Sequence, residues 1–259
     1  MTKKIIFFDI DGTLLDHHKQ LPKSTREAIH LLKKEGNEVA IATGRAPFMF
    51  ETLRKELQID TFVSYNGQYV VSKNKVIYTN PLDKKALQLL TEEAVLNHHP
   101  IAYMDHEDMK ANVSHHDYIT ESIHTLKIEH FPTYDPHYFK ERETYQSLLF
   151  CQENEEALYK EKFKHFDFVR WHPVSVDVVP AGGTKANGIA KVVENLGFEQ
   201  EHVFAFGDGL NDIEMLTNIP NSVAMGNAHN LAKKAARYIT RPVDRDGIMH
   251  GLKMVGLLA

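Results

Sequence analysis

The chain has 259 residues, of which 42% are hydrophobic and 25% charged, the composition of an ordinary globular protein. Its formal net charge is −5 with acidic and basic residues interspersed, so there is no basic patch for nucleic acid. No apolar stretch approaches the length of a membrane span, and the apolar run near the start is too short for a secretory signal. The single cysteine, Cys151, excludes an internal disulfide and should be a small buried side chain. We therefore expect a cytoplasmic protein in a reducing compartment.

The first predicted element is a buried parallel strand over residues 5–8, which leads into Asp9-Ile10-Asp11-Gly12-Thr13. Alternate residues of an extended chain share a face, so Asp9 and Asp11 are expected to converge. Gly12 allows a sharp turn and leaves backbone N–H groups open to an anion. Two close carboxylates favour a cation between them, and Mg²⁺ accepts carboxylates together with phosphate oxygens. A strand followed by an ordinary acidic turn is the alternative.

The next segments alternate between helix and strand, which predicts βαβ units and a parallel sheet. Ser24-Thr25 with Glu27 predicts the start of a helix through residue 32 that stops near Gly36. A strand at 39–42 leads into Thr43-Gly44-Arg45, and a strand at 63–65 leads into Asn66-Gly67. Residues 69–78 then read as a hairpin with its turn at 73–75.

Residues 83 to about 182 differ in pattern and contain most of the histidines. A helix at 84–96 precedes strands at 101–104 and 110–113, and a helix at 155–165 precedes strands at 169–171 and 174–179. This repeated pattern predicts an α+β lid with its own sheet, joined at Pro81 and at residues 180–183. A long insertion without motion is the alternative. The histidine pairs at 17–18, 98–99 and 115–116 are interpreted as surface residues, because adjacent side chains point apart and no partner spacing completes a zinc site.

The last part of the chain returns to the βα pattern. Lys185 opens a helix to residue 196, and a strand at 203–206 leads into Gly207-Asp208-Gly209-Leu210-Asn211-Asp212. A strand at 222–225, a helix at 229–236 and a short strand at 238–240 follow. Several strands thus end in polar groups suited to phosphate chemistry. In a parallel α/β sheet such groups meet at the carboxyl edge, where ligands bind.

The motifs of this chain resemble those of the haloacid dehalogenase superfamily. They occur in the same order: Asp-x-Asp-Gly-Thr, Thr-Gly-Arg, a lone Lys and Gly-Asp-Gly-x-Asn-Asp. Within it the chain is similar to the Cof-type phosphatases, which carry an inserted class IIB α/β cap; Asn66-Gly67 and residues 222–228 also match that branch. The resemblance implies an α/β fold, with a Rossmann-like parallel-sheet core at 1–82 and 183–259 and an α+β cap at 83–182. One departure is that Ala186 stands after the Lys where the family usually has Gly, and Gly188 comes later.

The resemblance also implies a Mg²⁺-dependent phosphatase that acts through an aspartyl-phosphate. Asp9 would be the nucleophile, and Asp11 would act as acid and then base. Mg²⁺ would be held by Asp9, Asp208 and the backbone carbonyl of Asp11. The expected phosphate or substrate contacts are Gly12, Thr43, Gly44, Arg45, Lys185 and Asn211. Asp212 would orient Lys185 or the metal's waters, with an N-cap role as its alternative. Arg45 and Asn66 lie at strand ends that face the expected cap, which predicts substrate contact; a solvated arginine and a turn asparagine are almost equally good interpretations.

The expected substrate is a small soluble phosphomonoester, such as a sugar phosphate or a phosphorylated cofactor. A phosphotransferase or sugar-phosphate mutase, with another hydroxyl in place of water, is the alternative function. A signalling module that keeps its phosphoryl group on Asp is a third hypothesis, although such modules are half this size and lack an inserted lid. We expect no nucleic-acid or membrane partner, and a monomer or weak homodimer.

Overall fold

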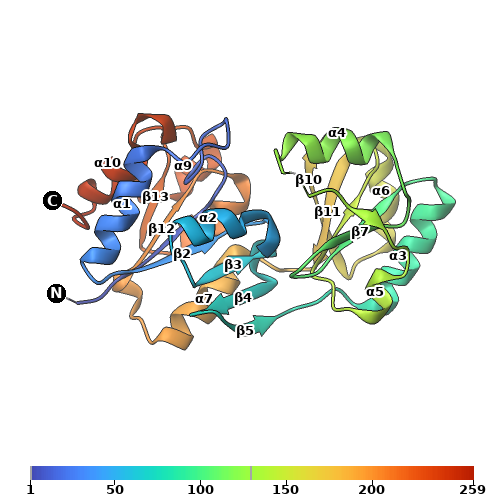
Figure 1. Ribbon diagram of the computed structural model, residues 1–259, viewed down its shortest axis with the longest axis horizontal. Helices are drawn as coiled ribbons and strands as arrows, with labels where there is room; N and C mark the ends of the chain where they lie inside the picture. Colours follow the sequence, from blue (N-terminus) through green and yellow to red (C-terminus); the bar gives the residue numbers. More distant parts are fainter. Residues whose placement is uncertain (1, 129) are drawn as a thin grey trace. The chain divides into compact units, whose positions relative to one another are not determined.

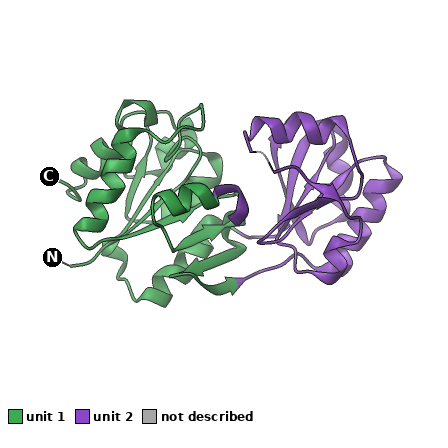
Figure 2. Ribbon diagram, in the orientation of Figure 1, with its two compact units in different colours: residues 1–45, 51–78, 184–259 green, residues 46–50, 79–183 purple. Residues whose placement is uncertain are grey.

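The computed structural model describes residues 2–128 and 130–259, and the chain forms two compact units (Figure 2). Residues 1–45, 51–78 and 184–259 make the first unit, and residues 46–50 and 79–183 make the second. Residues 79–183 are therefore inserted between two parts of the first unit, and the short segment 46–50, predicted to belong to the core, also groups with the second unit. The domain boundaries predicted from the sequence, at 82/83 and 182/183, lie within a few residues of these divisions and stay a prediction.

The first unit is built on an eight-stranded sheet with the strand order β14-β13-β12-β1-β2-β3-β4-β5 (Figure 1). The strands are parallel from β14 to β3, and β4 is antiparallel to β3. The predicted α/β fold with a parallel core sheet is confirmed. The strands are β1 (Ile5–Phe8), β2 (Glu38–Ala42), β3 (Phe62–Ser64), β4 (Tyr69–Ser72), β5 (Lys75–Thr79), β12 (Val203–Gly207), β13 (Asn221–Ala224) and β14 (Tyr238–Ile239).

Helices cover both faces of this sheet, as right-handed crossovers require when the strand order runs both ways from β1. Helix α1 packs against α10 and β2, whereas α7 packs against β3, β4 and α8. The helices are α1 (Lys23–Lys34), α2 (Glu51–Glu56), α7 (Lys185–Leu196), α8 (Ile213–Asn218), α9 (Asn230–Ala235) and α10 (Gly247–Met254), with 3₁₀ turns η2 (Tyr65–Gly67), η4 (Gln200–His202), η5 (Leu210–Asp212) and η6 (Val243–Arg245).

Helices α1 and α7, both of which the sequence predicted, start in different ways. Helix α7 has the predicted bounds, because the Thr184 side chain accepts a hydrogen bond from the Asn187 N–H and Gly197 ends it in the left-handed region. Helix α1 begins at Lys23 after Pro22, whose φ of −60° suits a helix entry, and no side chain caps it. The capping motif predicted at Ser24 was therefore wrong.

The second unit has a six-stranded sheet with the order β10-β11-β9-β6-β7-β8. Its pairings are antiparallel except for β7 with β8. The elements are η1 (Pro47–Phe50), α3 (Lys84–Leu96), β6 (Ile101–Met104), β7 (Met109–Ala111), α4 (Asp117–Thr125), β8 (Thr133–Tyr134), α5 (Tyr138–Glu141), β9 (Gln146–Leu149), η3 (Glu153–Glu155), α6 (Glu156–Lys162), β10 (Phe166–His172) and β11 (Ser175–Pro180). The sequence predicted α3 and β6 with their bounds, but it did not predict α4, α5, β8 or β9.

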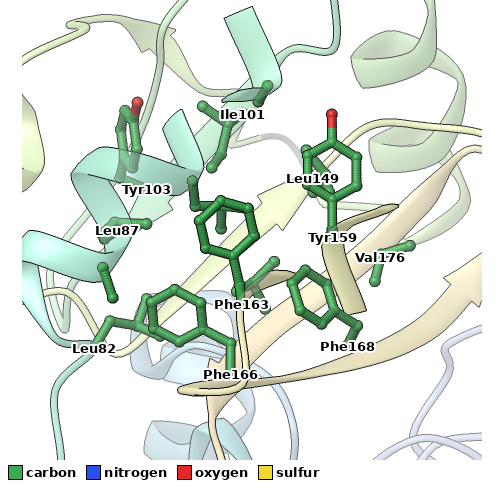
Figure 3. Packing of buried hydrophobic residues seen from close by; sticks show 14 of the residues in the cluster. Leu82, Leu87, Ile101, Tyr103, Leu149, Tyr159, Phe163, Phe166, Phe168 and Val176 are labelled. Atoms are coloured by element: carbon green, nitrogen blue, oxygen red, sulfur yellow. The ribbon is translucent and has the colours of Figure 1, made fainter. Parts of the chain in front are cut away.

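One face of this second sheet forms an apolar core with helices α3 and α6 (Figure 3). Tyr103 and Tyr159 are fully buried in it, together with Leu149 and Val176 from adjacent strands. Cys151 lies in the same cluster, and burial raises the pKa of its thiol to about 11, as expected for a packing residue. None of the helices in the described residues is both long and apolar enough to cross a bilayer.

Candidate active site

The candidate site lies at the carboxyl ends of three neighbouring parallel strands of the first unit. Strand β1 lies between β12 and β2 and is in parallel register with both. Asp9 follows β1, Thr43 follows β2, and Asp208 follows β12. These three side chains are brought to one edge of the sheet, where parallel α/β proteins bind ligands.

Three carboxylates and one ammonium group form the buried centre of the site. Ligand oxygens of Asp9, Asp208 and Asp212 all lie within 4.8 Å of one another. Lys185 is 1% exposed, and its Nζ lies 2.5 Å from Asp9 Oδ1 and 2.6 Å from Asp212 Oδ1. Burial opposes the charged ammonium, but Asp212 and Asp9 raise the pKa of Lys185 and keep it protonated. Asp9 and Lys185, which are 176 positions apart in the sequence, are thus joined directly.

Lys185 reaches the centre because the start of α7 comes very close to the turn η2. A β-carbon on Gly188 would lie 2.4 Å from Val63 Cγ1 and 2.9 Å from Gly67 Cα. Only glycine fits at such a backbone approach. Gly188 therefore allows the contact that brings α7 to the sheet edge, while Ala186 directly after the lysine does not prevent the helix start.

Asp212 has all its hydrogen bonds inside the protein. Its Oδ1 accepts from Lys185, and its Oδ2 accepts from the backbone N–H groups of Asp208 and Gly209 at 2.9 and 2.8 Å. The side chain therefore orients the ammonium group and shapes the loop that carries Asp208. Its carboxylate has little capacity left for a direct metal bond.

The remaining oxygens suit a hard divalent cation. Asp208 Oδ1 accepts from the Thr13 hydroxyl at 2.7 Å, whereas Asp208 Oδ2, Asp9 Oδ2 and the Asp11 backbone carbonyl accept no hydrogen bond from any described residue. A β-carbon on Gly12 would lie 2.2 Å from Asp208 Oδ2, so the turn leaves room for this oxygen. An all-oxygen donor set is the one that Mg²⁺ prefers.

The pKa shifts of the carboxyl groups in this cluster also indicate a site for a cation. Burial raises the pKa of Asp9 well above its usual value, with Lys185 opposing and the other aspartates adding to the shift. Burial also raises the pKa of Asp208 to about 6, although the Thr13 hydroxyl opposes this. A cluster of carboxylates that resists full ionisation lacks positive charge, which a bound cation would supply.

The Asp11 side chain is not part of the cluster formed by Asp9, Asp208 and Asp212. Strand β1 ends at Phe8, so the alternation of an extended chain does not continue to Asp11. Its carboxylate accepts from Arg45 Nε and Nη2, both at 2.7 Å, and from Lys19 Nζ at 2.6 Å. Burial would raise the pKa of Asp11, but the hydrogen bonds and charges of Arg45 and Lys19 lower it. Lys19 belongs to no motif, and the sequence did not predict it as a site residue.

The other predicted contacts surround this centre. Thr43 is 1% exposed; its oxygen accepts from the Arg45 N–H, and its hydroxyl hydrogen has no partner among the described residues. Asn211 Nδ2 donates to Asn66 Oδ1 at 3.1 Å, and a β-carbon on Gly44 would lie 3.1 Å from the same amide group. Asn66 itself has a φ of 51°, which asparagine tolerates. These residues come together from three loops.

This fold and site are those of a phosphoryl-transfer hydrolase built on a parallel α/β sheet. The family model for haloacid dehalogenase-like hydrolases matches residues 6–252, so the chain belongs to this family. The chain is 47% identical over 258 residues, covering all of both chains, to the Bacillus subtilis (strain 168) protein named "Putative phosphatase YkrA".

Two solved structures are similar over nearly the whole chain. A hypothetical protein from Geobacillus kaustophilus HTA426 is 54% identical with a TM-score of 0.95, over 99% of this chain and 100% of that one. The subclass IIB sugar phosphatase BT4131 is 30% identical with a TM-score of 0.86, over 99% of this chain and 100% of that one. The chain is a Cof-type member of the family and an enzyme of the phosphoric monoester hydrolase class.

Proposed function

We propose that this enzyme hydrolyses small phosphomonoesters with the help of Mg²⁺, through an aspartyl-phosphate on Asp9. The observation that carries the proposal is the direct contact of Asp9 with the buried Lys185, beside Asp208. Phosphate monoesters resist attack because the dianion repels nucleophiles, so a site must combine a nucleophile with positive charge. The sugar phosphatase BT4131, whose fold this chain shares, supports sugar phosphates as one substrate class.

In this mechanism Asp9 attacks phosphorus, and the bond to the leaving oxygen breaks as the protonated form of Asp11 gives that oxygen its proton. Asp11 then takes a proton from the water that cleaves the aspartyl-phosphate and releases phosphate. Lys185 holds positive charge at the transferred group, and the free hydroxyl hydrogen of Thr43 is available to one of its oxygens. Gly12, Gly44, Arg45 and Asn211 complete the proposed substrate contacts.

The proposed Mg²⁺ would be held by Asp9, Asp208 and the backbone carbonyl of Asp11, with waters. When bound, it supplies the charge that lets an anionic nucleophile approach an anionic substrate. The free oxygens of these residues support the fit. Asp212 acts through Lys185 and the Asp208 backbone.

The residues 83–182 are proposed to act as a cap that limits the substrate to small molecules. We also propose a cytoplasmic location, as the buried free Cys151 suggests. The alternative function is a phosphotransferase or mutase, in which another hydroxyl group, in place of water, accepts the phosphoryl group. Product analysis separates the two: free phosphate supports hydrolysis, and a relocated phosphoryl group supports transfer.

The direct test replaces Asp9 by asparagine, which keeps the shape of the side chain. Turnover of an aryl phosphate in Mg²⁺ should fall at least about 10³-fold with circular dichroism unchanged. A matched control is Asp60→Asn, which changes an aspartate that lies before β3 and outside the site. Substantial activity of Asp9→Asn, with the control active, would refute the assignment of the nucleophile.

A further inference from the structure

A second charged cluster lies in the first unit, apart from the pair of Asp9 and Lys185. Asp11 Oδ1 accepts from both Lys19 Nζ at 2.6 Å and Arg45 Nη2 at 2.7 Å, and Arg45 Nε donates to Oδ2. Two cations therefore share one carboxylate, and the three side chains carry a net charge of +1. One arginine alone would already satisfy Asp11 with two parallel hydrogen bonds. The second cation needs another explanation.

Lys19 is held at this place by its loop. Its φ of 60° lies in the left-handed region, which a residue with a β-carbon seldom adopts. Asp16 closes the loop: its carbonyl accepts from the Lys19 N–H at 2.9 Å, its carboxylate accepts from the Gln20 N–H at 2.9 Å, and its own N–H donates to the Gln20 carbonyl at 3.0 Å. Strained positions of this kind concentrate at functional sites.

The side chains of Lys19 and Arg45 have hydrogen bonds to Asp11 only, among the described residues, whereas Lys185 is bonded to Asp9 and Asp212. The two cations thus accompany the acid rather than the nucleophile. Their side chains are 26% and 12% exposed, while that of Lys185 is fully buried. Arg45 Nη1 and the remaining hydrogens of Lys19 Nζ have no partner within the described chain and stay available to a ligand.

We infer that Lys19, together with Arg45, selects phosphate esters whose leaving group carries a second anionic group, such as a carboxylate. The inference rests on the proposed function, in which Asp11 meets the leaving oxygen. Whatever is attached to that oxygen lies beside Asp11, and the net positive charge there favours an anion. The competing explanation is that Lys19 only offsets the charge of the transferred phosphoryl group, which every ester has.

A matched pair of substrates separates these explanations. 2-Phosphoglycolate and 2-hydroxyethyl phosphate have the same carbon chain, but the first ends in a carboxylate and the second in a neutral hydroxymethyl group. The wild-type enzyme should have the higher kcat/KM with 2-phosphoglycolate. Lys19→Met, which keeps the apolar stem, should reduce that preference roughly tenfold, mainly through KM. Lys19→Arg should keep most of the preference for 2-phosphoglycolate. Lys23→Met, four residues further on, should leave this preference unchanged.

Three results would overturn the inference. One is a wild-type preference for the neutral ester. Another is an equal fall of kcat/KM for both esters in Lys19→Met, which would assign the lysine to the phosphoryl group or to the loop alone. The third is loss of the preference in Lys19→Arg with unchanged circular dichroism. If the wild-type enzyme hydrolyses neither these esters nor an aryl phosphate in Mg²⁺, the proposed function fails as well; turnover of the aryl phosphate keeps the two failures distinguishable.

Discussion

The ammonium group of Lys185 lies 2.5 Å from Asp9 Oδ1, although the two residues are 176 positions apart in the chain. Lys185 is the first residue of α7, where the helix dipole disfavours a cation. The two buried carboxylates of Asp9 and Asp212 offset that cost. The lysine therefore serves both the stability of the core and the charge of the site.

Lys185→Met should accordingly lower activity and stability together. Removing the cation leaves two buried carboxylates without a positive charge beside them, which should cost about 3–5 kcal/mol of unfolding free energy, measured by urea denaturation. The kcat with an aryl phosphate should fall about 10²- to 10³-fold. Lys191→Met is the control on the same helix, because the ammonium group of this exposed lysine lies over the Tyr78 ring and makes no side-chain hydrogen bond or ion pair with a described residue. Equal effects of the two substitutions would contradict the assigned role.

The turn at Gly12 should control metal affinity. Ala at this position would place a β-carbon 2.2 Å from Asp208 Oδ2, so Gly12→Ala should displace that carboxylate. The Mg²⁺ concentration for half-maximal activity should rise roughly tenfold or more. Gly36→Ala is a matched control, since its φ of 84° is like the 83° of Gly12 but no atom lies within 4 Å of the added carbon.

Both glycine variants should lose about 1–2 kcal/mol of stability from backbone strain. Only Gly12→Ala should change the Mg²⁺ dependence. A similar metal dependence in both variants would mean that Asp208 does not hold the ion.

The sequence predicted the bounds of helices α3 and α7 to the residue, and both helices have a clear N-terminal cap. Asp83 and Thr184 each accept a hydrogen bond from a backbone N–H at the start of their helix, and such caps are local signals. The strand ends at Asp9, Thr43 and Asp208 were also predictable, because buried parallel strands read as short apolar runs.

The missed elements have no comparable local signal. Helix α4 is capped by the side chain of His116, a residue that seldom marks a helix start, and β8 has only two residues. The loop that presents Lys19 depends on hydrogen bonds of Asp16 and on a positive φ, neither of which follows from motif spacing. Contacts that form only in three dimensions decide these features.

Asp11→Asn should separate the two chemical steps. An amide cannot donate the proton that an alkyl leaving group needs, so kcat with an alkyl phosphate should fall about 10²- to 10⁴-fold. An aryl leaving group departs without that proton, whereas the water step still lacks its base. Stopped-flow measurements with an aryl phosphate should therefore show a burst of phenol followed by slow release of phosphate. A uniform decrease for both substrates without a burst would contradict the role of Asp11 as acid and base.

The second unit should have its own pH-dependent stability, through Asp177 on β11. Burial raises the pKa of this carboxyl to about 8, against the opposing effect of the nearby Trp171. In the unfolded chain it ionises near its ordinary pKa of about 4, so between pH 4 and 8 the folded state holds the extra proton. The stability that this proton confers is fully present below about pH 4, decreases as the pH rises from 4 towards 8, and is lost above the folded-state pKa. The asparagine in Asp177→Asn cannot ionise. The unfolding free energy of this variant should therefore fall less between pH 5 and pH 8 than that of the wild-type protein, by a few kcal/mol in total and by at most about 1.4 kcal/mol for each pH unit. Urea denaturation of both proteins at the two pH values measures this difference, and parallel pH profiles would show that Asp177 ionises normally in the folded protein.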